Sequence, residues 1–227
     1  MKKSILLFGL VLAICAPVSA HFVFLVPDGP SKGKAVFSDS LKPDKEGVPV
    51  DKIANTKLWT ISAGKTRELT WTLDKALNCY TFEVMGEAAG IVIGVTDYGV
   101  SQRGDAKPVW LQYYPKAIFG EMAGAAKAVG DPKVPVELTP IVDSGKLRFL
   151  ATIKGKPVAK ADVTVLVPGE EKTKVVQTDE SGRTEGFEKA GQYGAYFKAS
   201  EVQSGEKDGK KYEETRSYAT LVVTFGK

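Results

Sequence analysis

Residues 146–169 read KLRFLATIKGKPVAKADVTVLVPG, and this stretch carries the clearest strand pattern in the chain. Apolar and polar side chains alternate over residues 146–153, as in a strand with one buried face. Gly155 and Pro157 indicate a turn, and residues 162–167 form a second apolar, β-branched run. The stretch therefore predicts a strand, a turn and a second strand.

The same pattern continues on both sides of this stretch. Short apolar segments separated by turn residues are typical of antiparallel β-sandwiches. The further strands are predicted at residues 136–142, 174–179, 191–198 and 216–225, with a turn at 180–183. We therefore expect a β-sandwich domain over residues 136–227.

The preceding part of the chain also predicts strands. They fall at residues 22–26, 34–38, 56–62, 66–73, 78–84 and 90–95, with a polar loop at 39–55. Residues 63–65 read AGK and predict a hairpin between two of these strands. A Pro/Gly linker at 130–135 follows a weakly helical segment at 123–129 and marks a domain boundary. The predicted fold is all-β, with sandwich domains at 21–130 and 136–227 in tandem.

Residues 1–20 predict a cleaved signal peptide. Two lysines precede the apolar run at residues 5–14, and Val18-Ser19-Ala20 ends in small residues suited to cleavage. Cys15 raises the alternative of a lipoprotein anchor, although Ile14 stands where a small residue is preferred. No second run of spanning length follows, so we expect a periplasmic or secreted protein without a transmembrane segment in the mature chain.

Charge and cysteine content limit the classes of ligand and partner that the chain is expected to bind. The formal net charge is +4, two of the lysines lie in the leader, and the remaining charges are interspersed. This balance gives no support to nucleic-acid or membrane-surface binding. Removal of Cys15 with the leader would leave Cys79 as the one cysteine. It is either a small buried residue on a strand or, alternatively, a thiolate metal ligand.

His21 is the one histidine of the chain, and cleavage after Ala20 would make it the mature N-terminus. Its α-amine and imidazole would then form a two-nitrogen chelate of a kind that suits Cu(II) or Ni(II). The apolar run at 22–26 would hold that chelate on a strand. Oxygen from Asp97, Asp105 or a tyrosine, or sulfur from Cys79, could complete the site.

Asp97 and Asp105 are candidates because residues 96–107 are dense in polar side chains and follow a buried strand. Loops that leave a rigid scaffold often carry ligand contacts. The alternative is a solvated loop whose charges pair with one another.

The second half resembles the carboxypeptidase-regulatory-like, transthyretin-like β-sandwiches. The resemblance rests on residues 155–165 (GKPVAKADVTV), 177–183 (QTDESGR) and 190–196 (AGQYGAY), and it concerns fold more than function. The resemblance implies that residues 178–183 form a turn that links two strands.

The whole chain resembles the DUF4198 family of exported, NikM-like proteins. The motif His21-Phe22 with Leu25 and Pro27, and residues 218–221 (YATL), carry this resemblance. It implies handling of Cu or Ni. Related histidine-brace sites add a second imidazole, expected just before residues 219–221, where this chain has Ser217 and Tyr218. A complete brace is therefore impossible within one chain.

Two functions follow. The first is an exported metal-binding or metal-delivery protein that uses His21, with an envelope protein or transporter as partner. The alternative is a structural or ligand-binding β-sandwich module of the envelope with no metal role. An enzyme is not expected, because the sequence lacks a Gly-x-Ser-x-Gly motif, a phosphate loop and a metal-hydrolase motif.

Overall fold

The computed structural model describes residues 21–62, 64–84, 90–120 and 133–226. These residues form an all-β fold whose one helical turn is the 3-10 helix η1 (Val50–Ile53). The predicted β-sandwich character is therefore confirmed. The leader predicted at 1–20 and the helical segment predicted at 123–129 lie outside the described residues.

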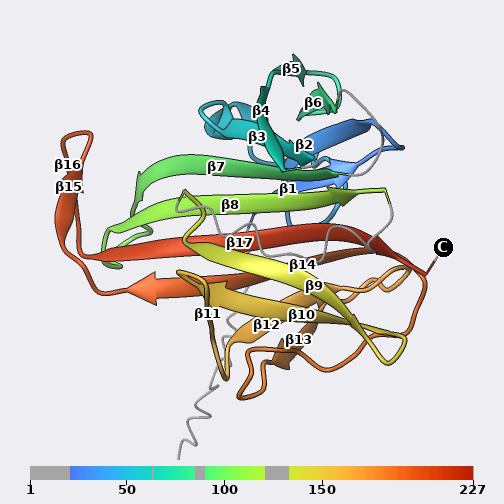
Figure 1. The fold of residues 1–227 in the computed structure, drawn as a ribbon. Coiled ribbons are helices and arrows are strands. Elements are labelled where there is room, and N and C mark those ends of the chain that lie inside the picture. Colours follow the sequence, from blue (N-terminus) through green and yellow to red (C-terminus); the bar gives the residue numbers. More distant parts are fainter. Residues whose placement is uncertain (1–20, 63, 85–89, 121–132, 227) are drawn as a thin grey trace, which may run out of the picture.

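A central eight-stranded sheet runs through the molecule (Figure 1). Its order is β13 (Lys174–Gln177), β12 (Asp162–Leu166), β14 (Gly191–Glu201), β17 (Glu214–Phe225), β8 (Val109–Phe119), β7 (Gly90–Ser101), β3 (Lys57–Ser62) and β4 (Lys65–Leu69). It takes strands from both sides of the predicted linker. Strands from the two halves of the chain meet where β17 pairs with β8. This pair is parallel, whereas all other pairs of the sheet are antiparallel.

Two smaller sheets cover the central one. The N-terminal cover sheet contains β1 (Phe22–Pro27), β2 (Lys32–Ser38), β6 (Cys79–Glu83) and β5 (Trp71–Asp74). The C-terminal cover sheet contains β11 (Lys156–Pro157), β10 (Lys146–Ile153) and β9 (Val136–Asp143). The first packs on β8 and β17 through β1, and the second packs on β17 through β9.

The two cover sheets lie on opposite faces of the central sheet. Successive side chains of a strand point to opposite faces. On β17, Val222 joins the core under the N-terminal cover sheet, whereas Leu221 and Val223 join the core under the C-terminal one. The two sandwiches predicted in tandem therefore share the central sheet between them.

Local features of the sequence appear where they were predicted. Strands β3 and β4 form the predicted hairpin, with Ser62 opposite Lys65. Strand β1 is buried over residues 22–26. Two predictions are wrong. Residues 66–73, predicted as one strand, divide between β4 in the central sheet and β5 in the N-terminal cover sheet. Residues 96–101 belong to β7, and only residues 102–108 form the loop. A bulge at Asp97 and Gly99 lets this polar segment continue pairing with β8.

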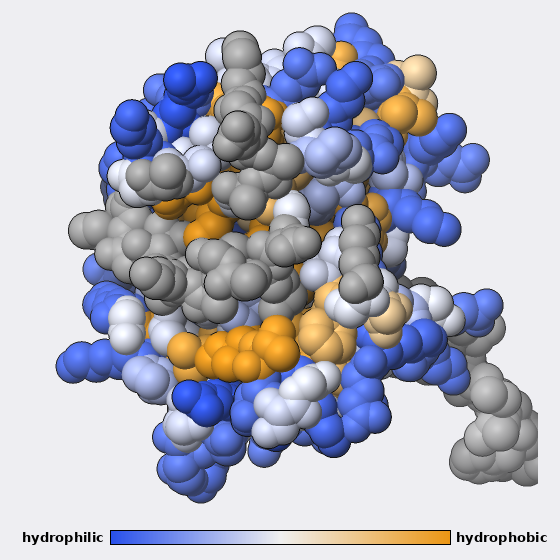
Figure 2. Space-filling model, turned by 45° about the vertical axis from the view of Figure 1, so that its right-hand side comes forward, coloured by the Kyte–Doolittle hydropathy of each residue, from blue (hydrophilic) through white to orange (hydrophobic). Residues whose placement is uncertain are grey.

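A small hairpin of β15 (Gly205–Lys207) and β16 (Lys210–Tyr212) connects β14 to β17 and extends beyond their ends (Figure 1). It contacts the central sheet through Tyr212, whose ring lies 5.5 Å from that of Trp110. The face drawn in Figure 2 is mostly hydrophilic, with hydrophobic side chains gathered in small areas. Within the described residues, no helix is long and apolar enough to cross a membrane.

Candidate metal centre and the adjoining cavity

His21 lies directly before β1, at the edge of the N-terminal cover sheet. Its side chain is mostly buried, with 13 % of its surface exposed. The ring lies 5.4 Å from that of Phe37, and the carbonyl oxygen accepts a hydrogen bond of 3.4 Å from the Tyr113 hydroxyl. Both the ring and the backbone of His21 are therefore positioned by neighbouring strands.

Asp44 supplies the carboxylate next to the imidazole. Its Oδ2 lies 3.1 Å from His21 Nε2. When Nε2 carries the proton and donates it to Asp44, the lone pair of the ring is on Nδ1, the nitrogen nearer the backbone. Carboxylates in this position orient histidine ligands in metal sites and raise their basicity.

The loop that carries Asp44 is held by Asn78. The Asn78 amide nitrogen donates to the Asp44 carbonyl oxygen at 2.6 Å, and its Oδ1 accepts from the backbone N–H of Val50 at 2.9 Å. Asn78 itself has a φ of 52°, a conformation that asparagine tolerates better than most residues. A side chain on the turn before β6 thus sets the position of the carboxylate beside His21.

The structure does not bring Asp97 or Asp105 to His21. Asp97 Oδ1 accepts from Trp110 Nε1 at 2.8 Å, and Oδ2 pairs with Lys207 at 2.9 Å. Burial alone would raise the pKa of Asp97, but hydrogen bonds from Trp110, Lys207 and Gly99 together hold it below its ordinary value. Asp105 is exposed in the loop after β7, and neither residue lines the cavity that His21 borders.

The other predicted donors are poor anionic ligands. Burial raises the pKa of the Cys79 thiol, which is enclosed in the core of the N-terminal cover sheet and does not line the cavity. Burial also raises the pKa values of Tyr113 and Tyr218, which do line it. These phenols stay protonated near neutral pH and act as hydrogen-bond donors.

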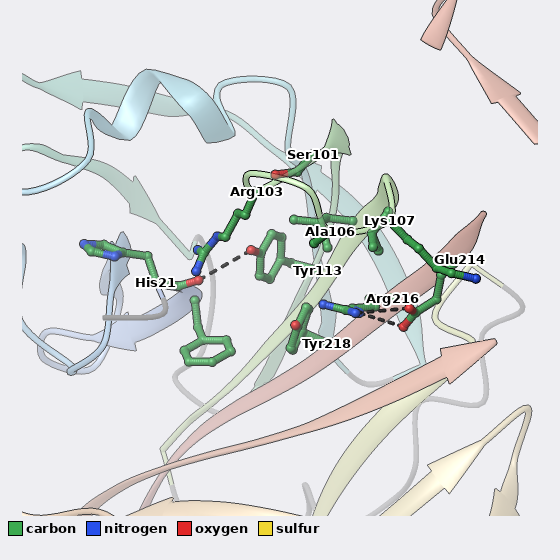
Figure 3. Close-up of a pocket in the computed structure, with 12 residues that line it drawn as sticks. His21, Ser101, Arg103, Ala106, Lys107, Tyr113, Glu214, Arg216 and Tyr218 are labelled. Atoms are coloured by element: carbon green, nitrogen blue, oxygen red, sulfur yellow. Dashed lines mark hydrogen bonds and ion pairs between the residues drawn. The ribbon is translucent and has the colours of Figure 1, made fainter. Parts of the chain in front are cut away.

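A cavity of about 350 Å³ opens beside His21 (Figure 3). The register of the parallel pair explains its floor, because Val109, Leu111 and Tyr113 of β8 lie opposite Glu214, Arg216 and Tyr218 of β17. These alternate residues share one face. Strand β1 packs on that face of the two strands and starts at Phe22, which also lines the cavity. His21 therefore stands where the cover sheet ends and the cavity begins.

Tyr218 occupies the place where the resemblance to histidine-brace proteins implied a second imidazole. It lines the same cavity as His21, and its ring is stacked 5.3 Å from that of Tyr113. No group of three or more His, Cys, Asp or Glu residues lies together within the described ranges. With the α-amine that cleavage after Ala20 would free, the donors at His21 would form a two-nitrogen chelate with open coordination positions rather than a closed cage.

Comparisons with protein-family models and with curated protein sequences find no match. Among solved structures, a two-domain fibronectin type-III segment from chicken tenascin is similar at 12 % identity. The match covers 87 % of this chain and 97 % of that one, with a TM-score of 0.21. A TM-score this low means that the two structures superpose poorly. The all-β fold is therefore assigned from the strands and sheets of this chain alone. The resemblance to the DUF4198 family stays a prediction.

Sequence reasoning missed Asp44, although a signal for it exists. The turn at residues 27–30 joins two predicted strands, and their antiparallel pairing places Phe22 opposite Ser38. The residues directly after Ser38 must then lie beside His21. The loop at 39–49 was therefore the place to look for a partner of the imidazole.

Proposed function

We propose that this chain is exported, cleaved between Ala20 and His21, and binds Cu(II) or Ni(II) through the mature N-terminus as a metal-binding or metal-delivery protein of the periplasm or cell envelope. One observation carries the proposal: Asp44 holds Nε2 of His21 at 3.1 Å. This contact leaves Nδ1 and the main-chain nitrogen of the same residue for the metal.

Rigidity supports this assignment. A chelate on a disordered end loses chain entropy when it binds a metal, which weakens the complex. Here β1 is buried over residues 22–26, and Thr220 of β17 donates a 2.6 Å hydrogen bond to the Val23 carbonyl oxygen. The chelating residue is thus ordered before the metal arrives.

The small number of protein donors fits delivery better than permanent storage. Two nitrogens leave coordination positions for water or for a ligand from a partner. A metal held in this way can be exchanged. We propose that an envelope protein or transporter receives it.

The test compares two forms of the metal-free protein, one beginning at His21 and one carrying an extra alanine before it. Titration calorimetry and electron paramagnetic resonance follow Cu(II) binding, and calorimetry alone follows Ni(II). We expect about one ion per chain and a two-nitrogen signature only in the form that begins at His21. Equal affinities for the two forms would overturn the proposal, as would an exported protein whose intact mass places the cleavage elsewhere.

Asp44 provides a second comparison. Loss of a carboxylate that orients a histidine ligand weakens metal binding by about 10- to 100-fold. Asp44→Asn should therefore weaken binding within this range, whereas Asp105→Asn, an exposed carboxylate away from His21, should leave it unchanged. A matching loss in both variants would point to overall charge rather than to orientation of the imidazole.

A further inference from the structure

The cavity beside His21 contains cationic side chains that a metal chelate does not need. Arg103, Lys107 and Arg216 line it, together with one carboxylate, Glu214. These charges oppose entry of a free cation and favour an anion. The cavity therefore suggests a ligand of its own, distinct from the metal.

Two of the three cations already have partners. Arg216 forms a two-point pair with Glu214, with distances of 2.6 and 3.0 Å, and Lys107 pairs with Glu213 at 3.1 Å. The carbonyl oxygen of Arg103 accepts from the Ala106 N–H at 3.0 Å, but within the described ranges its guanidinium makes no hydrogen bond or ion pair. Its side chain extends from the loop after β7 toward His21 and the Tyr113 hydroxyl (Figure 3). Arg103 is thus the guanidinium that is available to a ligand.

A phenol adds a donor near this guanidinium. Burial raises the pKa of the Tyr218 hydroxyl, against the opposing charge of the neighbouring Arg216, so the phenol keeps its proton near neutral pH. The O–H of Tyr218 can then donate into the cavity. Arg103 lowers the pKa of Tyr218 through its charge, which places the two groups within electrostatic reach of each other.

Apart from Ser101, which adds a hydroxyl, the rest of the lining is apolar or aromatic. The side chains concerned are Phe22, Ala106, Val109, Leu111 and Tyr113. Binding sites for small organic molecules combine such walls with a few convergent polar groups, and they start at about 300 Å³. One free guanidinium suits a single planar carboxylate, which it can hold by two parallel hydrogen bonds.

We propose that this cavity binds a small organic monocarboxylate, with the carboxylate on Arg103 and Tyr218 and the apolar body against Phe22, Val109 and Leu111. This inference goes beyond the proposed function, because it requires no metal. The anion would occupy the end of the cavity next to the backbone of His21, whose imidazole ring points away from Arg103 (Figure 3).

The probe is phenylacetate, and its neutral counterpart phenylacetamide is the control ligand. Calorimetry is performed on chelator-treated protein, so that the result is independent of metal binding. We expect phenylacetate to bind at least tenfold more tightly than the amide. Inorganic phosphate should not displace phenylacetate, because phosphate lacks the apolar body.

Variants of the cavity residues test where the carboxylate of phenylacetate binds. Arg103→Gln should weaken phenylacetate binding about tenfold or more, and Tyr218→Phe should weaken it by a smaller factor, since each removes hydrogen bonds to a charged group. Arg67→Gln makes the same change of charge on the exposed strand β4 and should have less than a twofold effect. Equal binding of acid and amide, an unchanged affinity in Arg103→Gln, or displacement by phosphate would overturn the proposal. Failure of Cu(II) binding alone would leave it standing.

Discussion

The ammonium group of Lys116 lies in the core between the central sheet and the C-terminal cover sheet. Its Nζ lies 2.6 Å from the carboxylate of Glu137 on β9, and the side chains are 2 % and 5 % exposed. Burial lowers the pKa of Lys116, and pairing with Glu137 opposes that change. Breaking such a pair on one side leaves a charge in the core, which costs about 3–5 kcal/mol.

Lys116→Met should therefore lower the free energy of unfolding by about 3–5 kcal/mol, whereas Lys116→Met combined with Glu137→Leu should recover most of the loss. Urea denaturation followed by circular dichroism measures both variants. If the double variant is less stable than the single one, the pair contributes through packing or further contacts rather than through charge compensation.

Asp97 gives a prediction about pH. Its folded-state pKa lies below the ordinary value of 3.8, so the ionised carboxylate stabilises the fold above that value and loses this effect as the pH falls through the lowered pKa. Asp97→Asn should cost roughly 1 kcal/mol at neutral pH, since the carboxylate and Lys207 are about one-third exposed. The difference from the unmodified protein should shrink below about pH 4 in urea titrations. A difference that stays constant down to pH 2 would contradict the assignment.

Single residues show which part of the site can be predicted. His21 was identified as a candidate because it is the one histidine and follows the predicted leader, and its strand was predicted from the apolar residues next to it. Asp44 was missed because its hydrogen bond spans 23 residues and depends on strand pairing. Arg103 lies in the polar segment that was singled out, but its role depends on β17, more than a hundred residues later in the chain.

At the scale of elements, β1 determines where His21 lies, and Thr220 attaches β1 to the central sheet. The Thr220 hydroxyl is fully buried and donates to the Val23 carbonyl oxygen at 2.6 Å. Thr220→Val keeps the shape but leaves this carbonyl without its donor, and an unsatisfied buried group costs about 1–3 kcal/mol.

Thermal and urea denaturation should therefore show Thr220→Val to be less stable by about 1–3 kcal/mol. Thr220→Ser, which keeps the hydroxyl and loses a methyl group, should be the milder change of the two. The opposite ranking would mean that methyl packing, rather than the hydrogen bond, anchors β1.

Among the elements, a turn could be predicted from the sequence, whereas the pairing of two distant strands could not. The turn at 178–183 was predictable because its contacts are local: Asp179 Oδ1 accepts from the backbone N–H groups of Ser181 and Arg183 at 2.8 and 2.9 Å. The parallel pairing of β8 with β17 was not, because hydrophobic alternation defines which face of a strand is buried and not which strand lies beside it. That pairing forms the floor of the cavity.

For the whole molecule, the shared central sheet couples the two sandwiches. Nine residues of β17 pair with β8, from Glu214 opposite Val109 to Val222 opposite Ala117. The core under the N-terminal cover sheet includes Val222, and the core under the C-terminal one includes Ile93 and Ile118. Neither core is built from one half of the chain, so we expect the halves to unfold together.

The three tryptophans make this expectation measurable, because Trp59, Trp71 and Trp110 all precede the predicted linker. Tryptophan fluorescence then reports on the N-terminal half, while far-ultraviolet circular dichroism reports on both. A shared sheet predicts coincident urea transitions by the two probes. Phe149→Leu, in the core of the second half, should lower stability by about 1 kcal/mol and shift the fluorescence transition equally. A fluorescence midpoint that stays in place while the circular dichroism midpoint moves would show that the sandwiches unfold independently.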